Sequence, residues 1–206
     1  MVALKSQTHR PSVLFINRLY PPARGASGRM LYDLSRAFRR DGWDVTVLTT
    51  GPRRDREDLS SGIQVERVKG LLKRKSAWRY SLIAIKMLLR GLRLPRHSLV
   101  ISMTDPPMLI VCARIIAWMK NSHHIHWCQD LYPDLLPHLG LNPGRLPMSF
   151  LTRLSRRSMK RCDKVVATGR CMARHLTHSG VEPSRVAVIP NWPDGELTGT
   201  SRPKRR

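Results

Sequence analysis

The chain has 206 residues, with 37 Lys and Arg against 14 Asp and Glu, a formal net charge of +23 and 41% hydrophobic residues. Its apolar residues lie in blocks that exclude wholesale disorder and suit a globular domain with basic edges. The longest nearly unbroken apolar stretch, Met108 to Met119, is shorter than the roughly 20 residues of a membrane-spanning helix. The first twelve residues contain no apolar block of signal-peptide length. We therefore expect a cytoplasmic protein, free or peripherally bound to the inner face of the cell membrane.

The first elements along the chain predict a βαβ unit. Val13 to Ile16 is a short, continuous apolar run, typical of a strand buried on both faces. A loop with prolines and glycines follows, and we expect Ser27 to cap a helix that ends at Gly42. Val45 to Thr49 predicts the second strand. This order of elements within about 40 residues implies parallel strands and a right-handed crossover.

The remaining segments continue the alternation of strands and helices. Strands are expected at 63–68, 99–103, 125–128, 164–168 and 185–189, and helices at 76–94, 108–119, 149–161 and 171–178. The fold class expected is α/β, with a Rossmann-like, doubly wound, mainly parallel sheet of about six or seven strands. We expect one domain over residues 1–192 and a basic, flexible tail over 193–206. In such sheets, ligands bind beyond the carboxyl ends of the strands.

The helix expected at 76–94 carries a cationic stripe. Arg79, Lys86, Arg90 and Arg93 are spaced by 7, 4 and 3 residues, and aliphatic residues fill much of the remainder. Ten basic residues and no acidic residue lie between positions 67 and 96. An apolar helix with a purely cationic stripe predicts contact with an anionic lipid interface. The same pattern also fits an outer helix with a solvated basic face, and the sequence leaves both interpretations open.

The loop before the first helix is a candidate anion-binding site. Gly25 and Gly28 bracket the start of that helix, where unpaired backbone N–H groups and the helix dipole favour an anionic group. The chain lacks both the G-x-G-x-x-G fingerprint and the G-x4-G-K-[ST] phosphate loop. Classical dinucleotide binding and P-loop phosphoryl transfer therefore have no support. Glycines before a helix also serve turn geometry alone.

The segment after the strand at 125–128 holds the densest polar and aromatic cluster in the chain. Asp130 and Asp134 flank a tight Tyr-Pro turn at the exit of this strand. A carboxylate held there can accept a hydroxyl proton or hydrogen-bond a polyol. Alternatively, Asp130 caps a helix that starts near residue 133. No G-x-S-x-G elbow is present, so hydrolase chemistry has no support.

The cysteines and histidines do not have the spacing of a metal site. The four cysteines are separated by 16, 34 and 9 residues, without any C-x2-C pair, and we expect unpaired thiols used as small apolar side chains: Cys112, Cys128, Cys162 and Cys171. Among His123, His124 and His126, the last two share one face of a strand, but no third ligand is apparent. We therefore expect no metal.

Four blocks, taken in order, resemble a known family. They are the opening strand and glycine loop at 13–28, the helix and strand at 31–47, the His-Trp-Cys-Gln-Asp-Leu-Tyr-Pro-Asp block at 126–134, and the closing segment at 186–192. Together they resemble the amino-terminal half of a family 4 glycosyltransferase with the GT-B fold. The block at 129–134 is similar in particular to transferases that build bacterial exopolysaccharide, colanic-acid-like or O-antigen units on a lipid carrier.

The resemblance implies a retaining transfer of a sugar from a nucleotide-sugar to a lipid-linked or saccharide acceptor, without a metal or other cofactor. It implies that the first glycine loop approaches the donor phosphates and that this half binds the acceptor. Many relatives have a histidine where this chain has Gln129 and Asp130, so we carry over a polar contact to Gln129 and a catalytic or acceptor role to Asp130. The remaining substrate contacts expected are Gly25, Ser27, Gly28, Tyr132, Asp134 and Asn191.

The donor side of such an enzyme is not apparent in this chain. Family members continue into a second Rossmann-like domain that binds most of the nucleotide-sugar and carries a spaced pair of glutamates. The glutamates of this chain do not reproduce that spacing: Glu57, Glu66, Glu182 and Glu196. We expect either that another polypeptide supplies the donor domain or that the chain is a truncated, noncatalytic remnant. In both cases the isolated chain should have little or no transferase activity.

The charge allows two further classes of partner. A net charge of +23 permits nonspecific nucleic-acid binding, but no nucleic-acid motif is visible. The strongest basic segment is interleaved with aliphatic residues instead of aromatic residues, which favours lipid head groups over bases. We rank an anionic membrane first, a lipid-linked substrate second and nucleic acid third. A noncatalytic module that docks a partner protein is the remaining alternative.

Overall fold

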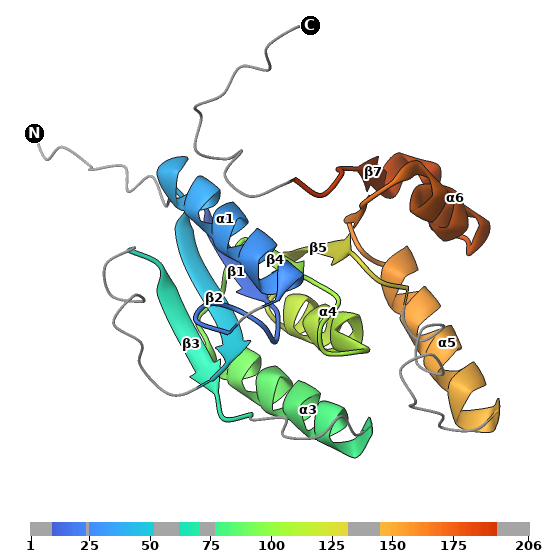
Figure 1. The fold of residues 1–206 in the computed structure, drawn as a ribbon, viewed down its shortest axis with the longest axis horizontal. Coiled ribbons are helices and arrows are strands. Elements are labelled where there is room, and N and C mark those ends of the chain that lie inside the picture. The colour runs from blue at the N-terminus through green and yellow to red at the C-terminus, as the bar shows by residue number, and fades with distance from the viewer. Residues whose placement is uncertain (1–9, 24, 52–61, 71–76, 132–144, 193–206) are drawn as a thin grey trace, which may run out of the picture.

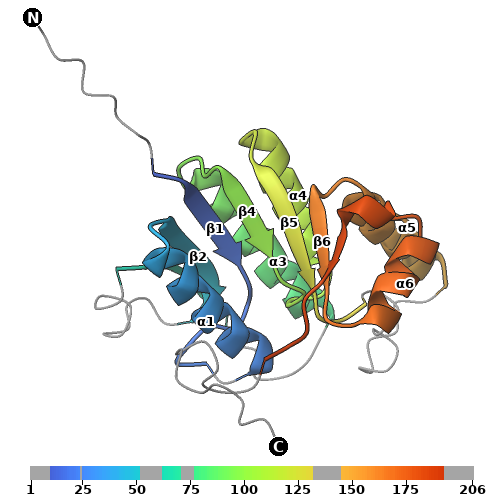
Figure 2. The same cartoon turned by 90° about the horizontal axis from the view of Figure 1, so that it is seen from above.

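A computed structural model of the chain describes residues 10–23, 25–51, 62–70, 77–131 and 145–192. The described part contains one parallel sheet of seven strands in the order β3-β2-β1-β4-β5-β6-β7. The strands are β1 (Ser12–Ile16), β2 (Asp44–Thr50), β3 (Gln64–Val68), β4 (Leu99–Ser102), β5 (His123–Cys128), β6 (Lys164–Ala167) and β7 (Val186–Val188). The expected Rossmann-like, doubly wound α/β fold is confirmed (Figures 1 and 2).

The helices that connect the strands agree with the expected ones to within a few residues. They are α1 (Ala26–Arg40), α3 (Ala77–Arg93), α4 (Leu109–Met119), α5 (Arg145–Lys160) and α6 (Arg170–His178), and a short 3-10 turn (Pro183–Arg185) precedes β7. The largest difference is at α5, which begins at Arg145 instead of Ser149 and takes Pro147 into its first turn. A proline is tolerated there because the first turn of a helix does not need its backbone N–H.

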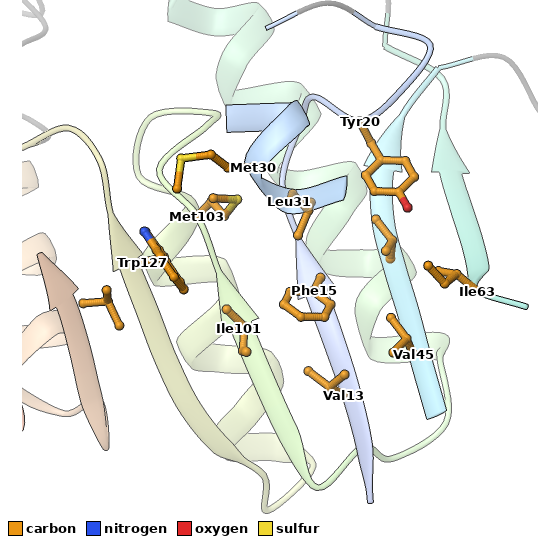
Figure 3. Packing of buried hydrophobic residues seen from close by; sticks show 12 residues of the cluster. Val13, Phe15, Tyr20, Met30, Leu31, Val45, Ile63, Ile101, Met103 and Trp127 are labelled. Atoms are coloured by element: carbon orange, nitrogen blue, oxygen red, sulfur yellow. The ribbon is translucent and has the colours of Figure 1, made fainter. Parts of the chain in front are cut away.

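One face of the sheet is covered by α1 (Figure 3). Val13 and Phe15 of β1 point to this face and are fully buried, together with Leu31 of α1. Alternate residues of a strand point to opposite faces, so Leu14 and Ile16 are buried on the other side. This alternation explains why β1 is an unbroken apolar run: both of its faces need apolar side chains.

The opposite face of the sheet is covered by the other helices. One cluster packs α3 and α4 on β1, β2 and β4, with Met87 and Ile116 fully buried. A second cluster packs α4, α5 and α6 on β5 and β6, around Cys128, Cys162 and Leu176. Right-handed crossovers explain this division. Helix α1 connects β1 to β2, a step across the sheet toward β3, whereas the later helices connect strands in steps toward β7. Steps in opposite directions place their helices on opposite faces of the sheet.

Candidate functional site

The carboxyl ends of β1, β4 and β5 are neighbours in the sheet, so the loops that follow them meet at one edge. The meeting is direct between the loop after β5 and α1: Gln129 Nε2 lies 2.8 Å from Met30 Sδ. Helix α1 and the first residues of the Gln129 block therefore lie together at this edge. Residues distant in sequence form a common surface at this edge.

Helix α1 begins two residues earlier than a cap at Ser27 would require. Its N-cap is Gly25, without a side-chain hydrogen bond, and Ser27 lies inside the first turn. The prediction that Ser27 caps the helix is wrong. Its hydroxyl instead accepts a hydrogen bond from Asn17 Nδ2 at 3.4 Å, which connects α1 to the end of β1. The unpaired N–H groups of this first turn lie at the carboxyl edge of the sheet, where the dipole favours an anion.

Gly28 has a packing role that is independent of any ligand. A Cβ atom at this position would lie 3.0 Å from the backbone carbonyl carbon and from Cβ of Leu19. Because real Cβ atoms rarely come so close to backbone, only glycine lets the loop after β1 lie directly against the helix. Close approach to the preceding loop therefore accounts for this glycine.

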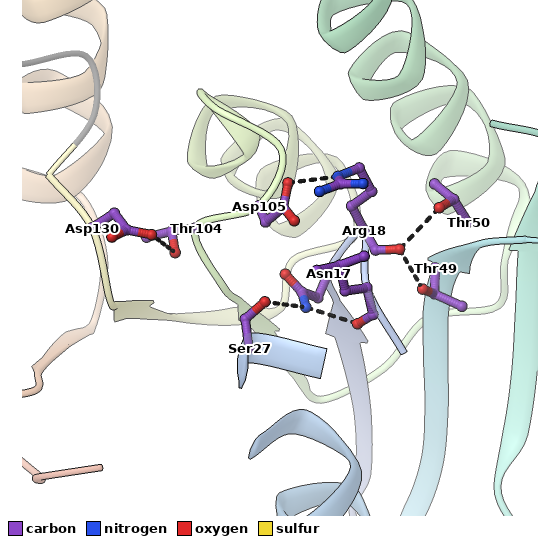
Figure 4. A network of polar contacts seen from close by, with 9 residues as sticks. Asn17, Arg18, Ser27, Thr49, Thr50, Thr104, Asp105 and Asp130 are labelled. Carbon is purple, nitrogen blue, oxygen red and sulfur yellow. Dashed lines mark hydrogen bonds and ion pairs between the residues drawn. The ribbon is translucent and has the colours of Figure 1, made fainter. Parts of the chain in front are cut away.

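Arg18 is held at the centre of this edge (Figure 4). Its backbone carbonyl accepts hydrogen bonds from Thr49 Oγ1 and Thr50 Oγ1, both at 2.9 Å, and its backbone N–H donates to the carbonyl of Asp105 at 2.7 Å. Its Nε donates to Asp105 Oδ1 at 2.7 Å. Its guanidinium also lies over the ring of Tyr80, 5.7 Å from the centroid. These contacts fix a cation among the ends of β1, β2 and β4.

Asp105 is the acidic partner of this cation. Burial raises the pKa of its carboxyl above the ordinary value, Arg18 opposes this effect through its hydrogen bond and charge, and the nearby Asp130 raises the pKa further. Neither Asp105 nor Arg18 was named as a site residue from the sequence. The available signal was an acidic residue directly after a strand of the same sheet, which places it at the ligand-binding edge.

Asp130 is exposed at the end of β5, and Gln129 is half-buried beside it. Asp130 Oδ2 accepts a hydrogen bond from Thr104 Oγ1 at 3.5 Å, so the loops after β4 and β5 are linked (Figure 4). The expected contacts at Tyr132 and Asp134, and the alternative that Asp130 caps a helix near residue 133, lie outside the described residues. Asp130 thus presents an accessible carboxylate, linked through Thr104 to the loop that holds Asp105.

The segment after β7 returns to the same part of the molecule. Asn191 is exposed, and Trp192 Nε1 donates to Asp33 Oδ2 of α1 at 3.2 Å. The Trp192 ring also packs edge-to-face on Trp127 of β5, with 5.8 Å between centroids. The chain at residue 192 is therefore attached to α1 and β5, although it leaves from the outermost strand of the sheet.

A buried polar cluster lies beneath this edge. Ser102 Oγ is 2.9 Å from both His124 Nε2 and His126 Nδ1, and His124 Nδ1 is 3.5 Å from Cys162 Sγ. Burial lowers the pKa of His124 to about 3 and that of His126 to about 4. Both rings are therefore neutral at physiological pH. The two histidines do share one strand face, as expected, and they bind a serine hydroxyl that the sequence did not identify.

The four cations assigned to membrane contact lie on α3. Lys86 and Arg93 are exposed and Arg79 is half-buried. Arg90 is paired with Glu66 of β3 at 2.5 Å, so the expected stripe of four cations is reduced by an acidic residue just outside the basic window. In the ranges that the structure describes, no helix is long and apolar enough to cross a membrane, and no three His, Cys, Asp or Glu side chains form a candidate metal site.

Comparison with known proteins decides the family. A family model described as a glycosyl transferase 4-like domain matches residues 25–192. The chain belongs to this glycosyltransferase family. No curated protein sequence matches the chain significantly. The matched residues include α1, the loops after β4 and β5, and Trp192. They do not include Arg18 in the loop after β1.

Solved structures show that this glycosyltransferase chain has the fold of GT-B enzymes. Anabaena Alr3699/HepE in complex with UDP and glucose is similar at 15% identity and a TM-score of 0.58, over 90% of this chain and 45% of that chain. Arabidopsis thaliana UGT89C1 complexed with UDP has values of 15%, 0.57, 90% and 53%. Sucrose-phosphate synthase from Thermosynechococcus elongatus has values of 12%, 0.56, 88% and 48%. The chain thus spans about half the length of these structures.

Proposed function

We propose that the chain is the acceptor-side lobe of a glycosyltransferase that moves a sugar from a nucleotide-sugar to a lipid-linked or polysaccharide acceptor. The observation that carries this proposal is the convergence of Arg18, the start of α1 and Asp130 at one edge of the sheet. The family match supports transferase chemistry. Polysaccharide biosynthesis at the cytoplasmic side of a membrane is the process that such an acceptor implies.

Asp130 is the residue that we assign to the acceptor. A carboxylate accepts hydrogen bonds only, so it binds a sugar hydroxyl and can receive its proton as the oxygen attacks the donor sugar. Its exposure leaves room for the acceptor, and Thr104 fixes one of its oxygens. Gln129 adds an amide that both donates and accepts, and Tyr132, Asp134 and Asn191 complete the proposed acceptor contacts.

The positive groups at this edge suit the phosphates of a nucleotide-sugar. Anabaena HepE was solved with UDP-glucose, and a diphosphate carries negative charge that Arg18 and the first-turn N–H groups near Gly25 and Ser27 can neutralise. A nucleotide-sugar enters here as a substrate, and the proposal requires no metal or other cofactor. These residues form one wall of the cleft.

We propose that the opposite wall of the cleft is a donor-side lobe, and the partner proposed for testing is a polypeptide that carries such a lobe. The GT-B structures above are about twice as long as this chain. The two glutamates within the described residues already have partners, since Glu66 binds Arg90 and Glu182 binds Arg185 and Ser184. Neither of these two described glutamates lies with Asp130 at the edge, so neither supplies the donor contacts that the resemblance leads us to expect of a glutamate pair.

The test is sugar transfer with the chain alone and with a candidate donor-side polypeptide encoded beside it. A panel of radiolabelled nucleotide-sugars, UDP-glucose included, is offered with membranes of the producing cell as acceptor. We expect transfer only by the mixture, and we expect Asp130→Asn to lower its rate on the order of 100-fold or more. The matched control is Asp41→Asn, an exposed acid at the other end of α1.

Each outcome bears on a separate part of the proposal. Efficient transfer by the chain alone overturns the assignment of the donor wall to a partner. Full activity of Asp130→Asn overturns the role of that carboxylate. The absence of transfer by the mixture across the panel overturns catalysis and favours a noncatalytic docking module.

A further inference from the structure

Helix α3 has two sides of different character. Its inner side packs on the sheet and on α4, with Ile83 and Met87 at 4% and 0% exposure. Its outer side exposes three large aliphatic residues, with Leu82 at 42%, Ile85 at 51% and Leu89 at 47%. Their spacing of three and four residues places them in one row along the helix. Such a continuous apolar row on the surface indicates contact with another apolar phase.

Cations border this row on the side that faces the outermost strand β3. A groove of about 720 Å³ runs between α3 and the edge strand β3, and its cationic lining includes Lys69, Lys86 and Arg93. Lys86 Nζ lies 3.5 Å from the carbonyl of Lys69, which holds the two residues together. Among the described residues that line the groove, Glu66 is the sole acidic one, and Arg90 neutralises it through two hydrogen bonds of 3.1 and 2.5 Å.

We propose that this outer face of α3 docks on an anionic lipid bilayer, with Leu82, Ile85 and Leu89 entering the interface and Lys69, Lys86 and Arg93 meeting lipid phosphates. Charge complementarity identifies the occupant, because the groove presents net positive charge directly beside aliphatic side chains. A nucleic acid offers phosphates but nothing apolar for this row, and base stacking would require aromatic residues. The sequence pattern left this helix open between lipid contact and ordinary solvation, and the exposed row is the observation that favours lipid.

The docked orientation places the site edge beside the membrane. Helix α3 runs back against the parallel strands, so it begins at their carboxyl ends (Figure 1). Tyr80 in its first turns lies under the Arg18 guanidinium, 5.7 Å from centroid to Cζ, which connects α3 directly to the edge. An acceptor anchored in the bilayer therefore reaches the edge with a short excursion. The docking inference stands on the surface of α3 alone, whereas this link to an acceptor rests on the proposed function.

The experiment is flotation of the full chain with vesicles of phosphatidylglycerol mixed with phosphatidylcholine, and with vesicles of phosphatidylcholine alone. We expect binding to the anionic vesicles only. Ile85→Glu combined with Leu89→Glu should lower the partition coefficient on the order of tenfold or more, because it removes both apolar burial and charge attraction. Phe150→Glu on α5, where the side chain is 63% exposed, is the control for a new charge at an exposed apolar position.

A second pair of variants separates a local site from the charge of the whole protein. Lys86→Glu with Arg93→Glu should weaken binding on the order of tenfold, whereas Arg153→Glu with Arg156→Glu on α5 carries the same change in charge and should weaken it far less. Circular dichroism and a thermal melt establish that each variant is folded.

The inference is overturned if the wild-type chain fails to float, if it binds phosphatidylcholine equally well, or if both charge variants act alike. It is also overturned if Ile85→Glu with Leu89→Glu binds as the wild type does, which would place the lipid contact away from the outer face of α3. No nucleotide-sugar or acceptor is present in this assay. A failed docking inference is therefore distinguishable from a failed transferase proposal.

Discussion

Acidification should destabilise the fold through the histidine pair beneath the site. His124 and His126 are buried and neutral, with pKa values that burial lowers to about 3 and about 4. In the unfolded chain each returns to an ordinary pKa of about 6.5. Below that value the unfolded chain binds protons and the native chain does not, so the free energy of unfolding falls as the pH falls from about 6.5 toward about 4.

The size of the effect follows from the two shifts. Within this window each histidine lowers the free energy of unfolding by about 1.4 kcal/mol for each unit that the pH falls, so the pair lowers it by nearly 3 kcal/mol per unit. Between about pH 7 and about pH 4.5 the loss is on the order of 5 kcal/mol, which is comparable to the whole stability of many domains. Asp163, whose pKa is lowered by its hydrogen bonds despite burial, contributes in the same direction at lower pH.

Urea denaturation at a series of pH values measures this slope directly. The variant His124→Asn with His126→Gln is expected to be less stable near neutral pH, because it disturbs the contacts with Ser102. Its stability should nevertheless vary much less between about pH 6.5 and about pH 4.5, since the titrating groups are gone. His178→Gln, at an exposed position on α6, is the control that should keep the wild-type slope. Parallel slopes for the wild type and the double variant would refute the assignment of acid sensitivity to this pair.

Three further predictions concern packing and charge at single positions. Gly91→Ala should lower the free energy of unfolding by about 1–3 kcal/mol, because its Cβ would lie 2.4 Å from Ile116 Cδ1, and Ile116→Val should recover part of the loss in a double-mutant cycle; additive losses would contradict this. Gly28→Ala should cost a similar amount, about 1–3 kcal/mol, because the loop backbone cannot retreat, and an unchanged thermal midpoint would disprove the packing role. Arg18→Met should raise the pKa of Asp105 further, as measured by NMR titration of its carboxyl carbon, and a lowered pKa would show that Arg18 does not stabilise the charged form.

The sequence predicted the sheet well because its central strands are short and buried on both faces. Such strands read as unbroken apolar runs, as at Val13–Ile16, and each is followed by a loop with turn residues. Parallel order then follows from the alternation with helices. The boundary error at α1 has a local cause: glycine and serine are both favoured N-cap residues, and only the backbone conformation shows that Gly25 takes that position.

The site was predictable as a place but not as a set of contacts. Parallel strands bring their following loops to one edge, which is sufficient to place the loop after β5 near α1. The pairing of Arg18 with Asp105 joins residues 87 positions apart. The pairing of Arg90 with Glu66 similarly joins a helix to an earlier strand. No local periodicity encodes such pairs, because they depend on register between strands and on side-chain rotamers.

Trp192 is attached on the face of the sheet opposite to the one that α3 covers. This residue is fixed to Asp33 and Trp127 on the face of the sheet that α1 covers, whereas α3 covers the reverse face. A donor-side lobe that packed on the α1 face beside Trp192 would leave the aliphatic row of α3 unobstructed. Under the proposed function, contact with that lobe and residence on a lipid surface would therefore be sterically independent.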